Sequence, residues 1–114
     1  MACEKQLHIF VGANPIAVFN FLCSQRVIAN DYQVEYTDYQ NYVVHLKRGM
    51  NLVSWGENIT IRIYSAAGGI TRIVIDSKPK MPTTLVDWGQ NQNNVNNIAQ
   101  YICSYFPQAS PPPV

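Results

Sequence analysis

The 114-residue chain predicts an α+β fold, a two-layer sandwich in which two helices cover one face of an antiparallel meander sheet. Two runs, 57–64 and 70–77, carry isoleucine at nearly every second position, which is the period of a half-buried strand. Two further segments, 15–23 and 87–106, carry apolar residues at helical spacing. Four consecutive strands with short connections favour a meander, so the expected order is β-α-β-β-β-β-α.

The first strand is expected over residues 5–11, where one set of alternate side chains is apolar. A helix should follow, because Asn14 can accept hydrogen bonds from the first free helical N–H groups and Pro15 suits the first helical position. This helix is apolar over most of its circumference and has Phe19 on its stripe. We therefore expect it to be well covered, and residues 24–31 to close it and turn.

The next two strands are expected at 32–36 and 42–47, separated by a polar turn. Alternation along the second of them points Tyr42, Val44 and Leu46 toward the core.

Gly68 and Gly69 can adopt positive φ without steric cost, so the two isoleucine runs should pair around them as a hairpin. If Tyr64 lies opposite Arg72, its ring can stack under the guanidinium group. The inner face is then Ile59, Ile61, Ile63, Ile73 and Ile75. The outer face, expected to be solvated, is Thr60, Arg62, Tyr64, Arg72, Val74 and Asp76.

The last helix should begin with a capping box, Asp87 followed three residues later by Gln90. Its apolar stripe consists of Val95, Ile98 and Ile102, and the asparagines at 93, 94, 96 and 97 are expected on the remaining faces. Asparagine is a poor helix former, so packing of the stripe on the sheet must stabilise this helix.

Residues 1–106 are expected to form one domain, because a chain of this length has room for a single core. The proline-rich segment 107–114 is expected to be a disordered tail. Charged residues make up 13% of the chain and the net charge is +1, which gives no general attraction for nucleic acid or anionic membranes. No apolar run approaches the roughly 18 residues of a membrane span.

The three cysteines, Cys3, Cys23 and Cys103, match no zinc or CxxC spacing and predict a reduced, cytoplasmic protein. Cys23 and Cys103 lie on apolar helix faces and should behave as small buried hydrophobes. His8 and His45 fall on outward faces of strands, so no metal is expected. The sequence holds no GxSxG and no glycine-rich phosphate loop, and no cofactor is expected.

Two stretches are similar in sequence: Ser-Trp-Gly-Glu-Asn at 54–58 and Asp-Trp-Gly-Gln-Asn at 87–91. Over most of residues 5–103 the chain resembles small bacterial domains of unknown function, which carry SWGE before an alternating strand and DWGxN at the start of a terminal helix. That family has no assigned activity, so the resemblance implies no catalytic residues. The element order is also similar to half of a TATA-binding-protein-like fold and to a shortened helix-grip domain, which are analogies of shape only.

The tryptophans of these stretches have two interpretations. Large rings can close the ends of a small core, or they can form an aromatic rim on a ligand pocket or partner surface. Asp87 is explained by its capping position and Glu57 by solvation, so neither requires a catalytic role. The residues predicted to bind a ligand or partner are Trp55, Trp88, Asp87, Asn91, Phe19 and Tyr42.

The leading hypothesis is a non-enzymatic binding or interaction domain that holds a small apolar ligand or a partner segment between sheet and helices. One alternative is an enzyme that uses Asp87, Glu57 and His45 in a cleft. Another is single-stranded nucleic-acid binding through the outer sheet face, but acidic residues are mixed with its basic ones. That basic, aromatic-bearing face would consist of Lys47, Arg48, Arg62, Arg72 and Tyr64. A homodimer through the outer face or an edge strand is compatible with each hypothesis.

Overall fold

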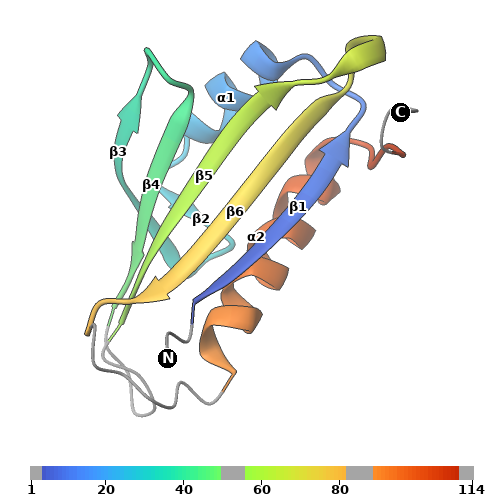
Figure 1. Cartoon of the computed structure of the whole chain (residues 1–114). Helices are drawn as coiled ribbons and strands as arrows, with labels where there is room; N and C mark the ends of the chain where they lie inside the picture. Colours follow the sequence, from blue (N-terminus) through green and yellow to red (C-terminus); the bar gives the residue numbers. More distant parts are fainter. Residues whose placement is uncertain (1–3, 50–55, 82–88, 111–114) are drawn as a thin grey trace.

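The computed structural model describes residues 4–49, 56–81 and 89–110. It is the predicted α+β sandwich: one antiparallel sheet of six strands, with two helices on one face (Figure 1). Among the helices that the structure describes, neither has the length and apolar content needed to span a bilayer. The elements are β1 (Lys5–Val11), α1 (Pro15–Cys23), β2 (Val27–Ile28), β3 (Tyr32–Asp38), β4 (Val43–Arg48), β5 (Glu57–Ser65), β6 (Thr71–Pro79) and α2 (Gln90–Tyr105), with a short 3-10 turn at Ala67–Gly69.

The strand order is β1-β6-β5-β4-β3-β2. Strands β2 to β6 form the expected meander, and the first strand pairs with the last, from Lys5↔Ser77 to Val11↔Thr71. The sheet has one strand more than predicted, because the segment expected to be a turn contains β2, which pairs with the start of β3. The turn between them depends on left-handed backbone at Ala29 and Asn30 (φ 52° and 65°), a conformation that alanine rarely adopts.

The isoleucine hairpin forms as predicted. Gly68 and Gly69 have φ of 74° and 73°, and β5 pairs with β6 in a register that includes Ile61↔Ile75. Tyr64 lies opposite Arg72, whose guanidinium carbon is 4.4 Å from the ring centroid.

Val74, predicted to be solvated, is only 5% exposed. It lies on β6 between His8 of β1 and Arg62 of β5, so side chains on the two neighbouring strands cover it.

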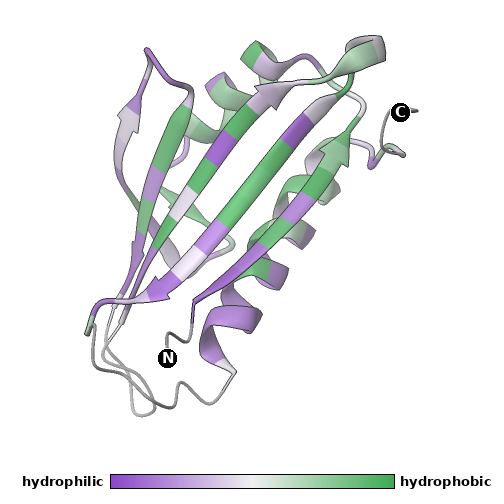
Figure 2. Cartoon of the chain, viewed as in Figure 1, coloured by the Kyte–Doolittle hydropathy of each residue, from purple (hydrophilic) through white to green (hydrophobic). Residues whose placement is uncertain are grey.

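The apolar core lies between the inner face of the sheet and both helices. Ile61 and Ile75 from the sheet and Ile98 and Ile102 from α2 have no exposed surface. A void able to hold a water molecule would leave exposed surface on the side chains that line it, so the seam between sheet and helices is filled at these positions. Figure 2 shows β6 green along its middle and β5 with green bands between purple and pale ones; both strands are paler or purple toward the end that lies near the start of α2.

Helix α1 begins as predicted, with Pro15 in the first turn and the Asn14 side chain accepting a hydrogen bond from the N–H of Ile16. Helix α2 does not. Its first residue is Gln90, and the preceding Gly89 occupies the capping position in a left-handed conformation (φ 75°). The predicted role of Gln90 in a capping box is therefore wrong. The Gln90 side chain donates a hydrogen bond to the Asn94 side chain within the helix. Asp87 lies outside the described residues.

The segment predicted to be a disordered tail starts with residues that are hydrogen-bonded to β1. The N–H of Gly12 donates to the carbonyl of Pro107, and the N–H of Ala109 donates to the carbonyl of Phe10. Gln108 thereby forms an antiparallel bridge with Val11. Residues 107–109 add a short strand-like segment to the free edge of the sheet.

Candidate functional site

The predicted binding residues that the structure describes do not form one site. Asn91 is fully buried on the first turn of α2, whereas Phe19 lies on α1 and packs against Tyr42. Trp55, Asp87 and Trp88 lie outside the described residues.

Phe19 belongs to the core, with 1% of its surface exposed beneath the rings of Tyr39 and Tyr42. Tyr42 was predicted to be a strand residue facing the core. It instead precedes β4 with a φ of 55° and is 39% exposed, and its carbonyl accepts a hydrogen bond from the N–H of Ile63. Tyr39 and Tyr42 thus cover the Phe19 ring of α1.

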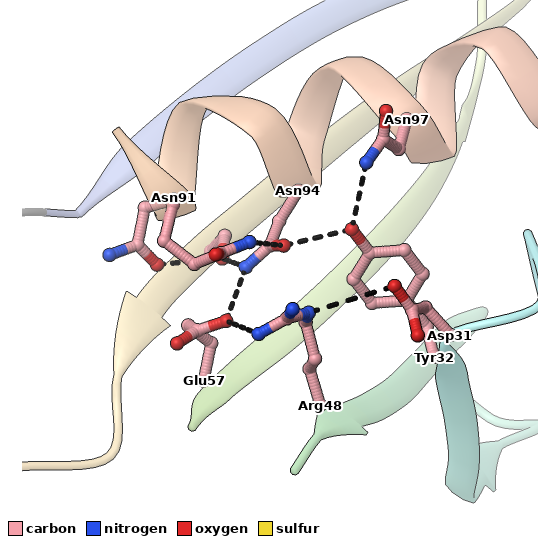
Figure 3. A network of polar contacts seen from close by, with 9 residues as sticks. Asp31, Tyr32, Arg48, Glu57, Asn91, Asn94 and Asn97 are labelled. Atoms are coloured by element: carbon pink, nitrogen blue, oxygen red, sulfur yellow. Dashed lines mark hydrogen bonds and ion pairs between the residues drawn. The ribbon is translucent and has the colours of Figure 1, made fainter. Parts of the chain in front are cut away.

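A network of polar side chains, buried at its centre and exposed at Asp31 and Asn97, lies beneath the first turns of α2 (Figure 3). It occupies inward-facing positions where β4 ends, β5 begins and β6 ends. We call it the polar cluster; its members are Asp31, Tyr32, Arg48, Glu57, Ser77, Gln90, Asn91, Asn94 and Asn97.

Asn94 is the centre of the cluster. Its Nδ2 donates to Glu57 Oε1 (2.8 Å) and to Ser77 Oγ (3.1 Å). Its Oδ1 accepts from the Tyr32 hydroxyl (2.8 Å) and from Gln90 Nε2 (3.0 Å). An amide side chain has two donor hydrogens and two acceptor lone pairs, so every hydrogen-bonding group of this buried residue is satisfied.

Glu57 was predicted to be solvated and is instead 2% exposed. The reason is its register: it lies two residues before Ile59 on β5 and therefore points to the same, inner face. Arg48 Nη1 lies 3.4 Å from Glu57 Oε1, which pairs the buried carboxylate with a cation. Within the described part of the chain, Arg48 Nε is buried without a hydrogen-bond partner, at 3.9 Å from Asp31 Oδ2.

The two Trp-Gly stretches meet in this cluster. The first supplies Glu57 and the second supplies Asn91, which accepts a hydrogen bond from Ser77 Oγ (2.8 Å). Ser77 also accepts from Asn94, which donates to Glu57. Glu57 and Asn91, one residue from each of the two similar stretches, are therefore connected through Ser77 and Asn94.

Tyr32 connects the cluster to β3. Its hydroxyl donates to Asn94 and accepts from Asn97 Nδ2 (3.3 Å). Burial raises the pKa of Tyr32, although the Asn97 hydrogen bond and the nearby Arg48 charge act in the opposite direction. The neutral phenol is therefore the form that the folded protein favours.

A groove opens along the edge of the sandwich, between β1 and α2, with a volume of about 410 Å³. Its floor is apolar, formed by Leu7 and Ile9 of β1 and by Ala99 and Cys103 of α2. Its rim is polar, with His8, Asn96, Gln100 and Gln108. This β1–α2 groove lies on the seam between sheet and helix, but the described residues predicted to bind a ligand, Phe19, Tyr42 and Asn91, are not among those that line it.

Cys23 and Cys103, the two cysteines that the structure describes, are half-buried rather than buried. Cys103 lies in the β1–α2 groove and Cys23 lies on α1, and both are free thiols. Burial is the main cause that raises the pKa of each thiol above its ordinary value, which disfavours the reactive thiolate form.

The outer face of the sheet carries a second, polar hollow of about 470 Å³ near the start of β1. Arg62 in this hollow is ion-paired with Asp76 at 2.5 Å. Lys47, elsewhere on the same face, lies 3.9 Å from Glu35. With Arg72 stacked on Tyr64, the three outward basic groups predicted to contact single-stranded nucleic acid each have an intramolecular partner.

The predicted catalytic set is not assembled among the described residues. Glu57 points to the inner face of the sheet, whereas His45 alternates with the buried Val44 and Leu46 and points outward. There it stacks on Tyr36, with ring centroids 4.2 Å apart. Burial lowers the pKa of His45. In residues 4–49, 56–81 and 89–110, no three His, Cys, Asp or Glu side chains are grouped to hold a metal ion.

No protein-family model matches the chain, and no curated protein matches it. Solved structures do. A START superfamily protein from Mycobacterium smegmatis superimposes with a TM-score of 0.64 over 90% of this chain and 95% of its own, at 6% identity. Ara h 8.0201 superimposes with a TM-score of 0.59 over 91% of this chain and 94% of its own, at 12% identity. The chain therefore has the fold of these START-like and Ara h 8-like structures, an antiparallel sheet wrapped against a long C-terminal helix.

Proposed function

We propose that this protein is a non-enzymatic binding domain that holds a small apolar ligand, or an apolar segment of a partner protein, in the β1–α2 groove. The observation that supports the proposal is the groove itself, with Leu7, Ile9 and Ala99 in its floor and polar side chains on its rim. Ligand sites are typically concave, mostly apolar and bordered by a few polar groups that orient the ligand.

The rest of the seam supports the same location. Core side chains such as Ile61 and Ile98 leave no exposed surface, and the polar cluster fills the end of the interior beneath α2. A ligand at either position would have to displace packed or hydrogen-bonded side chains. The groove offers apolar surface without that cost. The free thiols of Cys23 and Cys103 are compatible with a reducing, cytoplasmic compartment.

The test uses the two described cysteines as reporter and control. The fluorescent probe anilinonaphthalene sulfonate is titrated into the folded protein, and alkylation of each cysteine is followed by peptide mass spectrometry. At a probe concentration of about ten times Kd, Cys103 should be alkylated about tenfold more slowly, because only the unoccupied fraction reacts. Cys23 lies on α1, outside the groove, and its rate should not change.

A matched pair of variants tests the site directly. Ala99→Phe places a ring in the groove floor and should weaken probe binding about tenfold or more, whereas Ala17→Phe, on the exposed side of α1, should leave it unchanged. Probe binding that protects neither cysteine, or that survives Ala99→Phe in a folded protein, would place the ligand elsewhere. Absence of any binding by apolar probes would leave the proposed function without support.

A further inference from the structure

Strand β1 is an edge of the sheet, with β6 on one side of it. On the other side the carbonyl of Phe10 accepts from Ala109, and the N–H of Gly12 donates to Pro107. Backbone groups of alternate residues in a strand point to the same side. The N–H and C=O groups of Gln6 and His8 therefore point to the free edge as well, alongside the β1–α2 groove.

Among the described residues, the protein's own chain pairs with this edge at residues 107–109. The bridge between Val11 and Gln108 sets an antiparallel register in which Pro111 would lie opposite His8 and Pro113 opposite Gln6. Each of those positions has to donate an N–H to the β1 carbonyl, and proline has none. The prolines at 111 and 113 therefore lack the two N–H groups that a ladder in this register needs.

We propose that the β1–α2 groove receives an extended segment of a partner protein, which adds to β1 as an antiparallel strand and continues the pairing begun by residues 107–109. This inference rests on the proposed function and names the class of ligand. Edge-strand addition combines backbone hydrogen bonds, which provide affinity, with pockets for alternate side chains, which provide specificity.

The register predicts the chemistry of the segment. Side chains on paired strands point to the same face when they lie opposite one another. Residues opposite Leu7 and Ile9 therefore point into the apolar floor, and residues opposite Gln6 and His8 point to the polar outer face. The segment has apolar residues at every second position and polar, non-proline residues between them.

The experiment uses a synthetic peptide in which valine alternates with threonine between terminal lysines. Backbone amide exchange of the full-length protein is measured by NMR with and without peptide. The amides of Gln6 and His8 should become protected, and those of Leu7 and Ile9, which already face β6, should change little. N-methylation of the peptide at alternate residues should abolish binding in one of the two registers and be tolerated in the other.

Two substitutions at one position provide the matched control. His8→Pro removes the outward N–H and is compatible with an edge strand, whereas His8→Ala removes only the side chain. His8→Pro should weaken peptide binding about tenfold relative to His8→Ala, if the lost hydrogen bond and the altered edge together cost about 1.4 kcal/mol. Circular dichroism of both variants, compared with that of the wild type, establishes that the sheet is intact.

The outcomes separate the two proposals. Binding of the fluorescent probe without protection of Gln6 and His8 by peptide would overturn strand addition and leave the groove as a small-molecule site. Peptide binding that is indifferent to N-methylation in both registers would also overturn it. Protection of these amides by raised protein concentration alone, with a dimer in sedimentation, would assign the edge to a second copy of this chain and overturn the partner segment.

Discussion

The inner face of the sheet has two regions that are equally buried and chemically opposite. In the middle, Ile61 and Ile75 face Ile98 of α2; at the end beneath the start of α2, the same strands and helix present Glu57, Ser77 and Asn94. The apolar region is stabilised by loss of water from apolar surface and by close packing, which have no preferred direction. The polar cluster is stabilised by hydrogen bonds, which require particular atoms at particular positions.

The comparison shows that two equally buried regions can differ in how well they tolerate substitution. The apolar core should accept side chains of similar volume at modest cost, whereas the cluster should reject even a change of one atom at Asn94. Four predictions test this difference, in order of decreasing effect.

The largest effect is expected from Asn94→Asp, which is nearly isosteric. The carboxylate cannot donate to Glu57 or Ser77, and it places a second buried negative charge beside Glu57. We expect a loss of about 3–5 kcal/mol in the free energy of unfolding, measured by urea denaturation. Asn93→Asp, at the adjacent exposed position of α2, is the control and should change stability by less than about 0.5 kcal/mol. Equal effects of the two substitutions would show that the cluster is not a structural unit.

In the apolar region, Ile98→Ala should reduce the free energy of unfolding by about 3 kcal/mol, because it removes buried methyl and methylene groups and leaves a cavity. Ile98→Leu, which conserves volume, should cost less than about 1.5 kcal/mol. The control is Ile16→Ala, since Ile16 is 53% exposed on α1. If Ile98→Leu proved as costly as Asn94→Asp, the contrast between the two regions would be lost.

Tyr32→Phe should cost about 1–2 kcal/mol near neutral pH, because Asn94 and Asn97 each lose a partner. Burial raises the pKa of Tyr32 above its ordinary value of 10.0, so its neutral form is favoured in the folded state. The stabilisation from neutral Tyr32 is complete below the pKa of the unfolded state. It is lost as the pH rises through the pKa of the folded state. The stability difference between wild type and Tyr32→Phe should therefore narrow above about pH 10. Tyr36→Phe, on the outer face, controls for general alkaline effects; a constant difference for Tyr32→Phe would contradict this account.

The smallest effect is expected outside the core. A double-mutant cycle on Tyr64 and Arg72, whose guanidinium lies over the ring, should give a coupling free energy of about 0.5 kcal/mol. The measurement is chemical denaturation of both single alanine variants and the double variant. A coupling free energy as large as the loss expected for Tyr32→Phe would show that the outer face is more than a solvated surface.

Local pattern predicted much of the architecture. The alternating isoleucines identified the hairpin and its buried face, Asn14 and Pro15 identified the start of α1, and the stripe that includes Ile98 identified α2. These features depend on neighbours in the sequence, so local pattern is sufficient to detect them.

The polar cluster was missed although a signal for it was present. Glu57 continues the alternation of Ile59 and Ile61, Ser77 continues that of Ile75, and Asn94 precedes Ile98 by one turn of the helix. Polarity was interpreted as solvation, whereas position in the repeat predicts which way a side chain points. What alternation cannot show is whether a buried polar group has a partner, because members of the cluster lie on β3, β4, β5, β6 and α2.

By itself, the sequence determined the fold class, the inner face of the isoleucine hairpin and the amphipathic nature of α2, because side-chain period follows directly from backbone geometry. Only the tertiary structure decided that β1 pairs with β6, that Asn94 joins Glu57, Ser77 and Tyr32, and that a groove with one free strand edge opens between β1 and α2. Those features depend on contacts between residues that are distant along the chain, and the register of such contacts is set by how whole elements pack.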